Sequence, residues 1–174
     1  MTGRRGVLVT LAAVAAIAAG IGVRRLLQPG NSEPPKTLAL QQLVLPDLDG
    51  IPQSFTQWAG RILVANFWAT WCGPCREEIP VLVSAQSKYA SKNVQIVGIS
   101  IDTVDKIKKF IPPFNINYPL VVGGLESIEL MRSLGNQAGG LPFTVVVAPD
   151  GGMQQHLGPL DHQGLDKLLK IRAS

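Results

Sequence analysis

The sequence predicts an α/β fold in which a mixed central β-sheet is flanked by helices on both faces. Two apolar segments of strand length, residues 61–67 and 94–101, are each followed by a segment with helical character. Toward the C-terminus the β-branched segment 143–147 is joined by a Pro-Asp-Gly-Gly turn to a second strand over residues 153–157. Strand–helix units that end in a hairpin and a helix give a sheet of mixed strand direction.

The first half of the body is predicted as a hairpin followed by a strand–helix–strand unit. Residues 43–45 and 51–55 form the N-terminal β-hairpin, because the Asp49-Gly50 step supplies turn chemistry between them. A helix over residues 73–89 connects the two buried strands. Pro80 lies inside this helix, where it removes one backbone hydrogen bond and predicts a kink.

The second half adds one extra βα unit before the closing hairpin. Asp102 is predicted to cap a helix over residues 103–111 that ends before two prolines, and a strand over residues 118–122 follows. The next helix, over residues 126–134, has Gly135 in the position of a C-terminal cap. The last helix is predicted over residues 160–172.

Basic charge is concentrated at the N-terminus. Residues 1–36 carry five basic and one acidic side chain, whereas residues 37–174 carry 11 of each sign. A nucleic-acid-binding domain requires a basic patch on its folded part, so the neutral body argues against a nucleic-acid partner. The excess charge instead belongs to a segment that directs the chain to a membrane.

Residues 7–23 form an uncharged apolar run of 17 residues between two arginine pairs. We predict a membrane anchor or signal segment over residues 1–25, a Pro- and Gly-rich linker over 26–36, and a catalytic domain over 37–174. The run exceeds the apolar region of a typical cleaved signal peptide, which favours an uncleaved anchor. Cleavage remains an alternative, because small-residue triplets such as Ala16-Ile17-Ala18 suit a signal peptidase.

The only two cysteines are Cys72 and Cys75, which lie directly after the first buried strand. Two cysteines within one helical turn bring their Cα atoms within disulfide distance, and the first sulfur meets the free N–H groups of the helix start. A zinc site would need about four ligands, and the only histidines, His156 and His162, are far downstream with unsuitable spacing. A purely structural disulfide would gain little from closing so short a loop. A redox-active dithiol is therefore the favoured interpretation, and no metal is expected.

The segment 64–80, VANFWATWCGPCREEIP, strongly resembles the membrane-anchored TlpA/ResA branch of the thioredoxin superfamily. Gly140-Leu141-Pro142-Phe143-Thr144 and Pro149-Asp150-Gly151 match a second signature of that family. The resemblance covers residues 40–172. It implies a thioredoxin-like fold in which the βα unit near residues 102–124 is an insertion, and an activity as a thiol:disulfide oxidoreductase outside the cytoplasm.

The resemblance also implies roles for single residues. Cys72 resembles the attacking thiolate, Cys75 the resolving thiol, and Pro142 the cis-proline of the family. Glu78 lies about one helical turn after Cys75 and is expected to move the proton of that thiol. Thioredoxin has a buried Asp where this chain has Asn66, which cannot titrate.

A small apolar platform for a flexible disulfide substrate is expected around Cys72. Its predicted members are Trp71, Gly73, Pro74 and Leu141. The other two tryptophans, Trp58 and Trp68, are expected in the core. Glu77 and the two histidines are expected at the surface, without a catalytic role.

We therefore expect a reductase, because Gly73-Pro74 between the cysteines resembles reducing thioredoxins. It is expected at the cytoplasmic membrane, facing the periplasm or extracytoplasmic space. Its expected partners are disulfide-bearing proteins, including those of cytochrome c maturation, and a membrane thiol carrier as electron donor. No cofactor is expected beyond the Cys72/Cys75 disulfide. The alternatives are a disulfide oxidase or isomerase, a copper metallochaperone on the same fold, and a protein released to the periplasm after signal cleavage.

Overall fold

The computed structural model describes residues 36–170, and the side chains of residues 37–169. The anchor or signal segment over residues 1–25 lies outside the described residues, as does the linker except for Lys36. Within residues 36–170 no helix has both the length and the apolar character needed to cross a membrane.

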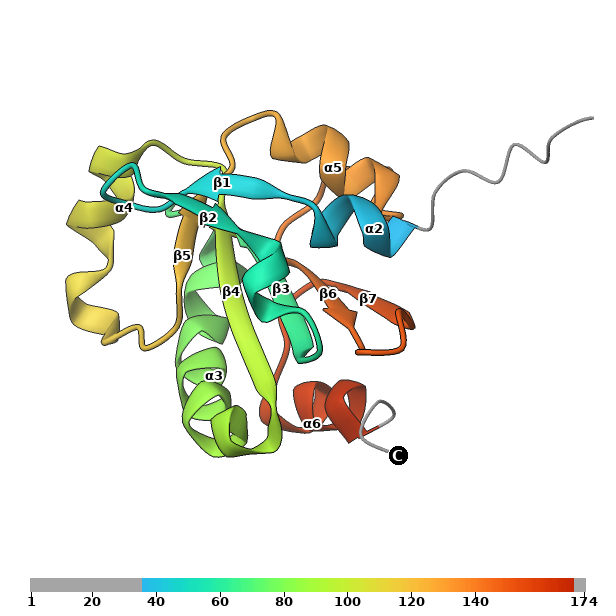
Figure 1. Ribbon diagram of the computed structural model, residues 1–174. Helices are drawn as coiled ribbons and strands as arrows, with labels where there is room; N and C mark the ends of the chain where they lie inside the picture. The colour runs from blue at the N-terminus through green and yellow to red at the C-terminus, as the bar shows by residue number, and fades with distance from the viewer. Residues whose placement is uncertain (1–35, 171–174) are drawn as a thin grey trace, which may run out of the picture. The chain divides into compact units, whose positions relative to one another are not determined.

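A five-stranded mixed sheet forms the centre of the described domain (Figure 1). The strand order is β5-β4-β3-β6-β7, with β3, β4 and β5 parallel to one another, and with β6 and β7 joined in antiparallel fashion. The strands span Ile62–Trp68 (β3), Val94–Ser100 (β4), Leu120–Val122 (β5), Phe143–Val147 (β6) and Met153–Leu157 (β7). The predicted α/β fold with a mixed central sheet is confirmed.

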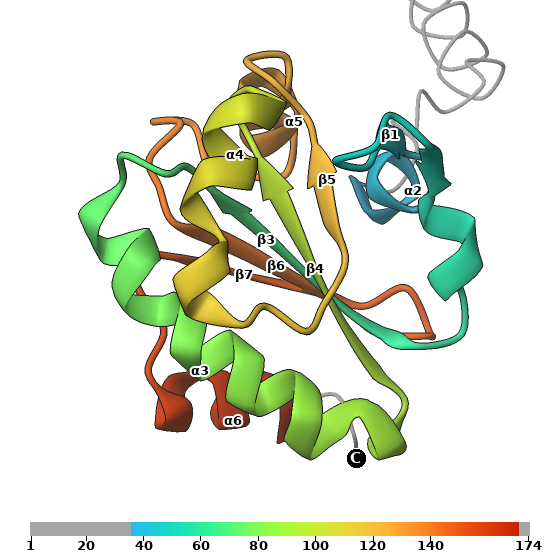
Figure 2. The same cartoon turned by 90° about the vertical axis from the view of Figure 1, so that its left-hand side faces the viewer.

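Helices cover both faces of this sheet, as the sequence predicted (Figure 2). On one face, α3 (Gly73–Tyr89) and α6 (His162–Lys170) pack on side chains such as Val64, Ile96 and Val146. On the other face lie α2 (Lys36–Gln41), α5 (Ser127–Ser133) and the hairpin formed by β1 (Val44–Pro46) and β2 (Pro52–Ser54). Alternate residues of β3 pack on opposite faces of the sheet, because successive side chains of a strand point in opposite directions.

The insertion consists of α4 (Val104–Phe110), a 3₁₀ turn (Pro112–Phe114) and β5. The predicted cap of α4 is wrong. Thr103, with extended backbone angles, occupies the N-cap position, and its side chain makes no capping bond. The carboxylate of Asp102 instead accepts hydrogen bonds from Thr70, so it binds the loop after β3 and does not cap α4.

Several elements differ from the prediction: residue 55 begins a 3₁₀ turn (Phe55–Trp58) and not the end of a strand, and α6 begins at His162 and not at residue 160. Two further differences have identifiable reasons. The six-residue helix α2 was not predicted, because so short a segment carries little helical signal of its own; Leu40 anchors it with 0 % exposure. Strand β5 begins at Leu120 and not at residue 118. The preceding Pro119 has no N–H to donate to a ladder, although its carbonyl accepts the N–H of Gly98 at 2.9 Å.

Candidate active site

Cys72 and Cys75 lie where β3 ends and α3 begins. They form a disulfide with a Cα–Cα distance of 5.3 Å. Cys72 is the N-cap residue of α3, and its Sγ accepts the backbone N–H of Cys75 at 3.3 Å. An N–H donor and the positive end of the helix dipole at this sulfur would stabilise a thiolate after reduction.

The two sulfurs differ in how deeply they lie. Cys75 is fully buried, whereas Cys72 retains 6 % exposure. Both pack in one apolar cluster with Trp68, Ile79 and Ile107 from β3, α3 and α4. The geometry therefore makes Cys72 the sulfur that a substrate can approach, with Cys75 behind it.

The Leu141–Pro142 peptide bond is cis, and it lies just before β6. Strand β6 pairs with β3 in antiparallel fashion, with Phe143 opposite Phe67. Pro142, one residue before Phe143, therefore lies beside the end of β3, where the cysteine loop starts. Leu141 is half-buried and packs on the cluster that contains both cysteines. The sheet thus brings together two segments that are about 70 positions apart in the sequence.

Glu78 is a buried carboxyl on α3, 1 % exposed. Its Oε1 accepts the side-chain amide of Asn66 at 2.7 Å, and its Oε2 accepts the backbone N–H of Leu160 at 3.0 Å. Burial raises the pKa of Glu78 to about 7, although these two donors act in the opposite direction. Asn66 also donates to Thr144 at 3.0 Å, so the carboxyl is held in a network of side chains from the helix and the sheet.

The residues expected to bind substrate lie at the surface around Cys72. Trp71 is 65 % exposed, and Gly73 and Pro74 are exposed at the start of α3. A side chain placed on Gly73 would meet no atom within 4 Å, so substrate has open space there. Beside it, a shallow groove of about 430 Å³ is lined by Gly73, Arg76, Glu77 and Phe114.

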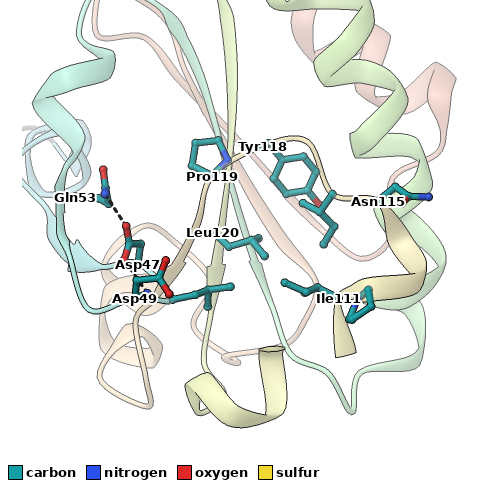
Figure 3. Close-up of a pocket in the computed structure, with 11 residues that line it drawn as sticks. Asp47, Asp49, Gln53, Ile111, Asn115, Tyr118, Pro119 and Leu120 are labelled. Atoms are coloured by element: carbon teal, nitrogen blue, oxygen red, sulfur yellow. Dashed lines mark hydrogen bonds between the residues drawn. The ribbon is translucent and has the colours of Figure 1, made fainter. Parts of the chain in front are cut away.

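A second, open groove of about 540 Å³ lies between the β1–β2 turn and the insertion (Figure 3). Asp47 and Asp49 form its acidic rim, while Tyr118, Pro119 and Leu120 contribute to its floor. Asp47 accepts the side-chain amide of Gln53 at 2.8 Å across this rim. Neither cysteine lines this groove.

Of the five remaining residues, four are placed as expected, whereas His156 is less exposed than expected. Trp58 and Trp68 are buried at 7 % and 2 % exposure, and Glu77 is exposed. His162 is exposed and His156 is half-buried on β7. In residues 36–170 no group of three or more His, Cys, Asp or Glu side chains is placed to hold a metal ion.

Sequence reasoning missed two side chains that bind the loops around the disulfide. Asp102 binds Thr70, as described above. Asn136, 4 % exposed, donates to the carbonyl of Gly140 at 2.8 Å and accepts its N–H at 3.3 Å, which fixes the chain before Leu141. A useful signal for Asp102 was its position directly after a buried strand parallel to β3, where its side chain meets the same end of the sheet.

Comparison with known proteins shows what this chain is similar to. Residues 38–156 match the model of the AhpC/TSA family. A thiol-disulfide oxidoreductase ResA from Bacillus thuringiensis subsp. konkukian is 29 % identical over 131 residues, which cover 73 % of this chain and 72 % of the relative.

Among solved structures, a thioredoxin-related protein from Neisseria meningitidis serogroup B is 36 % identical, with a TM-score of 0.67 over 74 % of this chain and 97 % of that one. A thiol:disulfide interchange protein of the thioredoxin family from Chlorobium tepidum TLS is 29 % identical, with a TM-score of 0.67 over 76 % of this chain and 93 % of that one.

Proposed function

The chain belongs to the AhpC/TSA family, has a thioredoxin-like fold and is a thiol–disulfide oxidoreductase; from that premise we propose that it works as a reductase of protein disulfides. The observation that carries the proposal is the unequal burial of the two cysteines, together with a buried carboxyl, Glu78, that follows Cys75 by three residues on α3 and has a pKa of about 7. An accessible first thiol, a buried second thiol and a proton acceptor near neutrality are what a two-step dithiol exchange requires.

In the first step the Cys72 thiolate attacks one sulfur of a substrate disulfide. A mixed disulfide forms between Cys72 and the substrate, and the other substrate sulfur leaves as a thiolate that takes up a proton. The helix N-terminus stabilises the attacking thiolate, since the N–H of Cys75 lies 3.3 Å from Sγ of Cys72. Trp71 and the backbone of Leu141 would hold an extended substrate segment in place.

In the second step Cys75 resolves the mixed disulfide. The Cys75 thiol gives its proton to the Glu78 carboxylate and attacks Sγ of Cys72, and the substrate thiolate leaves and is protonated. Two electrons pass from the dithiol to the substrate, and the Cys72–Cys75 disulfide is formed. A second dithiol must then reduce the enzyme again, for which a membrane thiol carrier is the donor that we propose.

Reduction as the direction of exchange is supported by Gly73-Pro74 between the cysteines, the dipeptide of reducing thioredoxins. The basic and apolar N-terminal sequence supports a location at the cytoplasmic membrane with the domain outside the cytoplasm. In that place the substrates would be proteins whose cysteines must stay reduced, such as apocytochrome c before haem attachment.

Equilibration in a thiol redox buffer tests the direction, with the fluorescence of Trp68 and Trp71 as the readout. We expect a reduction potential below about −230 mV, toward the value of about −270 mV for thioredoxin. A potential above about −180 mV would make the protein an oxidase or isomerase and would remove the role in cytochrome maturation.

Trapping tests the route of exchange. A Cys75→Ala variant cannot resolve the mixed disulfide, so we expect substrate proteins to stay linked to Cys72 in a membrane extract. The matched Cys72→Ala variant should capture none, because Cys75 is fully buried. Equal capture by both variants would contradict the assigned order of attack.

A further inference from the structure

The carboxylate of Asp102 binds the loop that leads from β3 to the disulfide. Its Oδ2 accepts two hydrogen bonds from Thr70, one from the backbone N–H at 2.7 Å and one from the hydroxyl at 2.8 Å. Both bonds end on the same residue, so Thr70 is held by its main chain and its side chain together. We call this pair of bonds the Asp102–Thr70 clamp.

The register of the parallel strands explains why these two residues meet. Trp68 of β3 lies opposite Ser100 of β4, and the N–H of Ile101 still donates to the carbonyl of Trp68 at 3.1 Å. Two residues further along each chain the strands have ended, and Thr70 lies opposite Asp102. The carboxylate supplies the acceptor that the N–H of Thr70 would otherwise lack.

The clamp is partly buried and charge-assisted, because Asp102 is buried and Thr70 is half-buried. Asp102 is 7 % exposed, and the ammonium of Lys106 lies 3.7 Å from its other oxygen. Hydrogen bonds to an ionised acceptor are about twice as strong as neutral ones, and the burial of the acceptor limits competition from water. The clamp is therefore strong enough to fix the conformation of a surface loop.

Trp71 depends on this clamp more than Cys72 does. Cys72 is held by α3, of which it is the N-cap, and its N–H donates to the carbonyl of Ala69 at 3.2 Å. Trp71 is 65 % exposed, so packing contributes little to its position. It lies between the clamped Thr70 and the helix cap, and both neighbours must be fixed for the indole to keep one orientation.

We propose that Asp102 is a positioning residue that acts through Thr70 to hold Trp71 in the orientation that protein substrates bind. The proposal rests on the proposed function, in which Trp71 contacts substrate next to Cys72. Asp102 itself touches neither substrate nor the reacting sulfurs. Its loss weakens the binding of a polypeptide disulfide and leaves the chemistry of the dithiol unchanged.

The test compares a protein disulfide with a small one. Steady-state reduction of insulin, with dithiothreitol as the electron donor, gives KM and kcat for a protein disulfide. The rate of reduction of dithiobis-nitrobenzoate, a small disulfide, measures the reactivity of Cys72 without the binding of a polypeptide. Thr70→Val removes the hydroxyl bond and keeps the shape of the side chain. We expect it to raise KM for insulin by about fivefold to tenfold, as the loss of one good hydrogen bond implies. The kcat and the small-disulfide rate should stay within about twofold, by the same reasoning.

Three further variants separate positioning from a general loss of structure. Asp102→Asn, which keeps the shape but removes the charge, should raise KM in the same way. Thr70→Ser retains the hydroxyl, so its KM for insulin should equal that of wild type. Thr56→Val makes the same chemical change at an exposed threonine of the 3₁₀ turn Phe55–Trp58, before β3, and should alter neither constant. If Asp102→Asn fails to fold, the two Thr70 variants still decide the question.

A double-mutant cycle identifies Trp71 as the residue that the clamp serves. Trp71→Ala should raise KM for insulin, and adding Thr70→Val to it should raise KM no further. An additive increase, or an unchanged KM in Thr70→Val alone, would overturn the positioning role and leave the reductase proposal standing. If Trp71→Ala leaves KM unchanged, the proposed substrate surface itself is wrong and the inference falls with it.

Discussion

Burial in the fold changes the acid–base chemistry of Glu78. Its carboxyl is buried between α3 and the sheet, and the pKa of about 7 means that both protonation states are populated near neutral pH. An exposed glutamate three residues after a cysteine could not store a proton at that pH. The neighbouring Glu77 is exposed and offers a matched comparison.

Replacement of this carboxyl should slow the resolving step. In Glu78→Gln nothing accepts the Cys75 proton, so we expect the release of substrate from Cys72 to slow on the order of a hundredfold. The pH profile of that step should also lose its inflection near pH 7. Stopped-flow release of a fluorescent peptide from the mixed disulfide measures both effects. Glu77→Gln should behave as wild type, and the same loss in both variants would exclude a specific role for Glu78.

The same pKa predicts how stability depends on pH in the oxidised protein. The folded pKa, about 7, lies above the ordinary glutamate value of 4.5, so the folded state holds a proton that the unfolded state releases. Wild type should therefore lose stability as pH rises from about 4.5 to about 7, by roughly 3 kcal/mol in this contribution. Glu78→Gln should not show this loss. Urea unfolding at pH 4.5, 6 and 8 measures the free energy of unfolding of wild type and of Glu78→Gln. If the difference between the two proteins does not change with pH, the pKa assigned to Glu78 is wrong.

At the scale of the elements, α4 completes the apolar surroundings of the disulfide. Ile107 is fully buried and packs in the same cluster as Cys72 and Cys75. The residues before and after it on the outer face, such as Lys109, are exposed. The insertion is thus part of the wall around the active site and not a separate appendage.

Truncation of Ile107 should cost stability and affect the dithiol together. Ile107→Ala leaves a cavity beside the sulfurs, so we expect a loss of about 2–5 kcal/mol in the free energy of unfolding. Water that enters this cavity would also change the reduction potential. Lys109→Ala on the same helix should stay within about 0.5 kcal/mol of wild type in unfolding experiments. Equal effects of the two substitutions would show that α4 does not pack on the site as described.

Most elements could be predicted because their signals are local. The bounds of α3, β6 and β7 agree with the predicted ranges, since apolar periodicity and turn residues lie within each segment. The function of Asp102 could not be predicted in this way. An Asp after a strand and before a helix satisfies the local rule for a cap, whereas its partner Thr70 is 32 positions away and is fixed by strand register. The two donors to Glu78 are distributed in the same manner, with Asn66 12 and Leu160 82 positions away.

At the scale of the whole molecule, the direction of electron transfer depends on which redox state of the dithiol folding stabilises. The potential of the dithiol in the folded protein differs from that in the unfolded chain only if folding favours one redox state. A reductase is a fold that stabilises its disulfide, and a strong oxidant is a fold that stabilises its thiols. Direction can therefore be determined without any substrate.

We expect the oxidised protein to be more stable than the reduced one. Each 30 mV by which the folded potential lies below that of the unfolded chain should add about 1.4 kcal/mol to the oxidised form. Urea unfolding of both forms gives this difference, and redox equilibration in concentrated urea gives the potential of the unfolded chain. A Cys72→Ser/Cys75→Ser variant, which has no redox chemistry, should unfold identically with and without reductant. If reduction instead stabilises the protein, the fold favours its thiols, and an oxidase must replace the reductase that we propose.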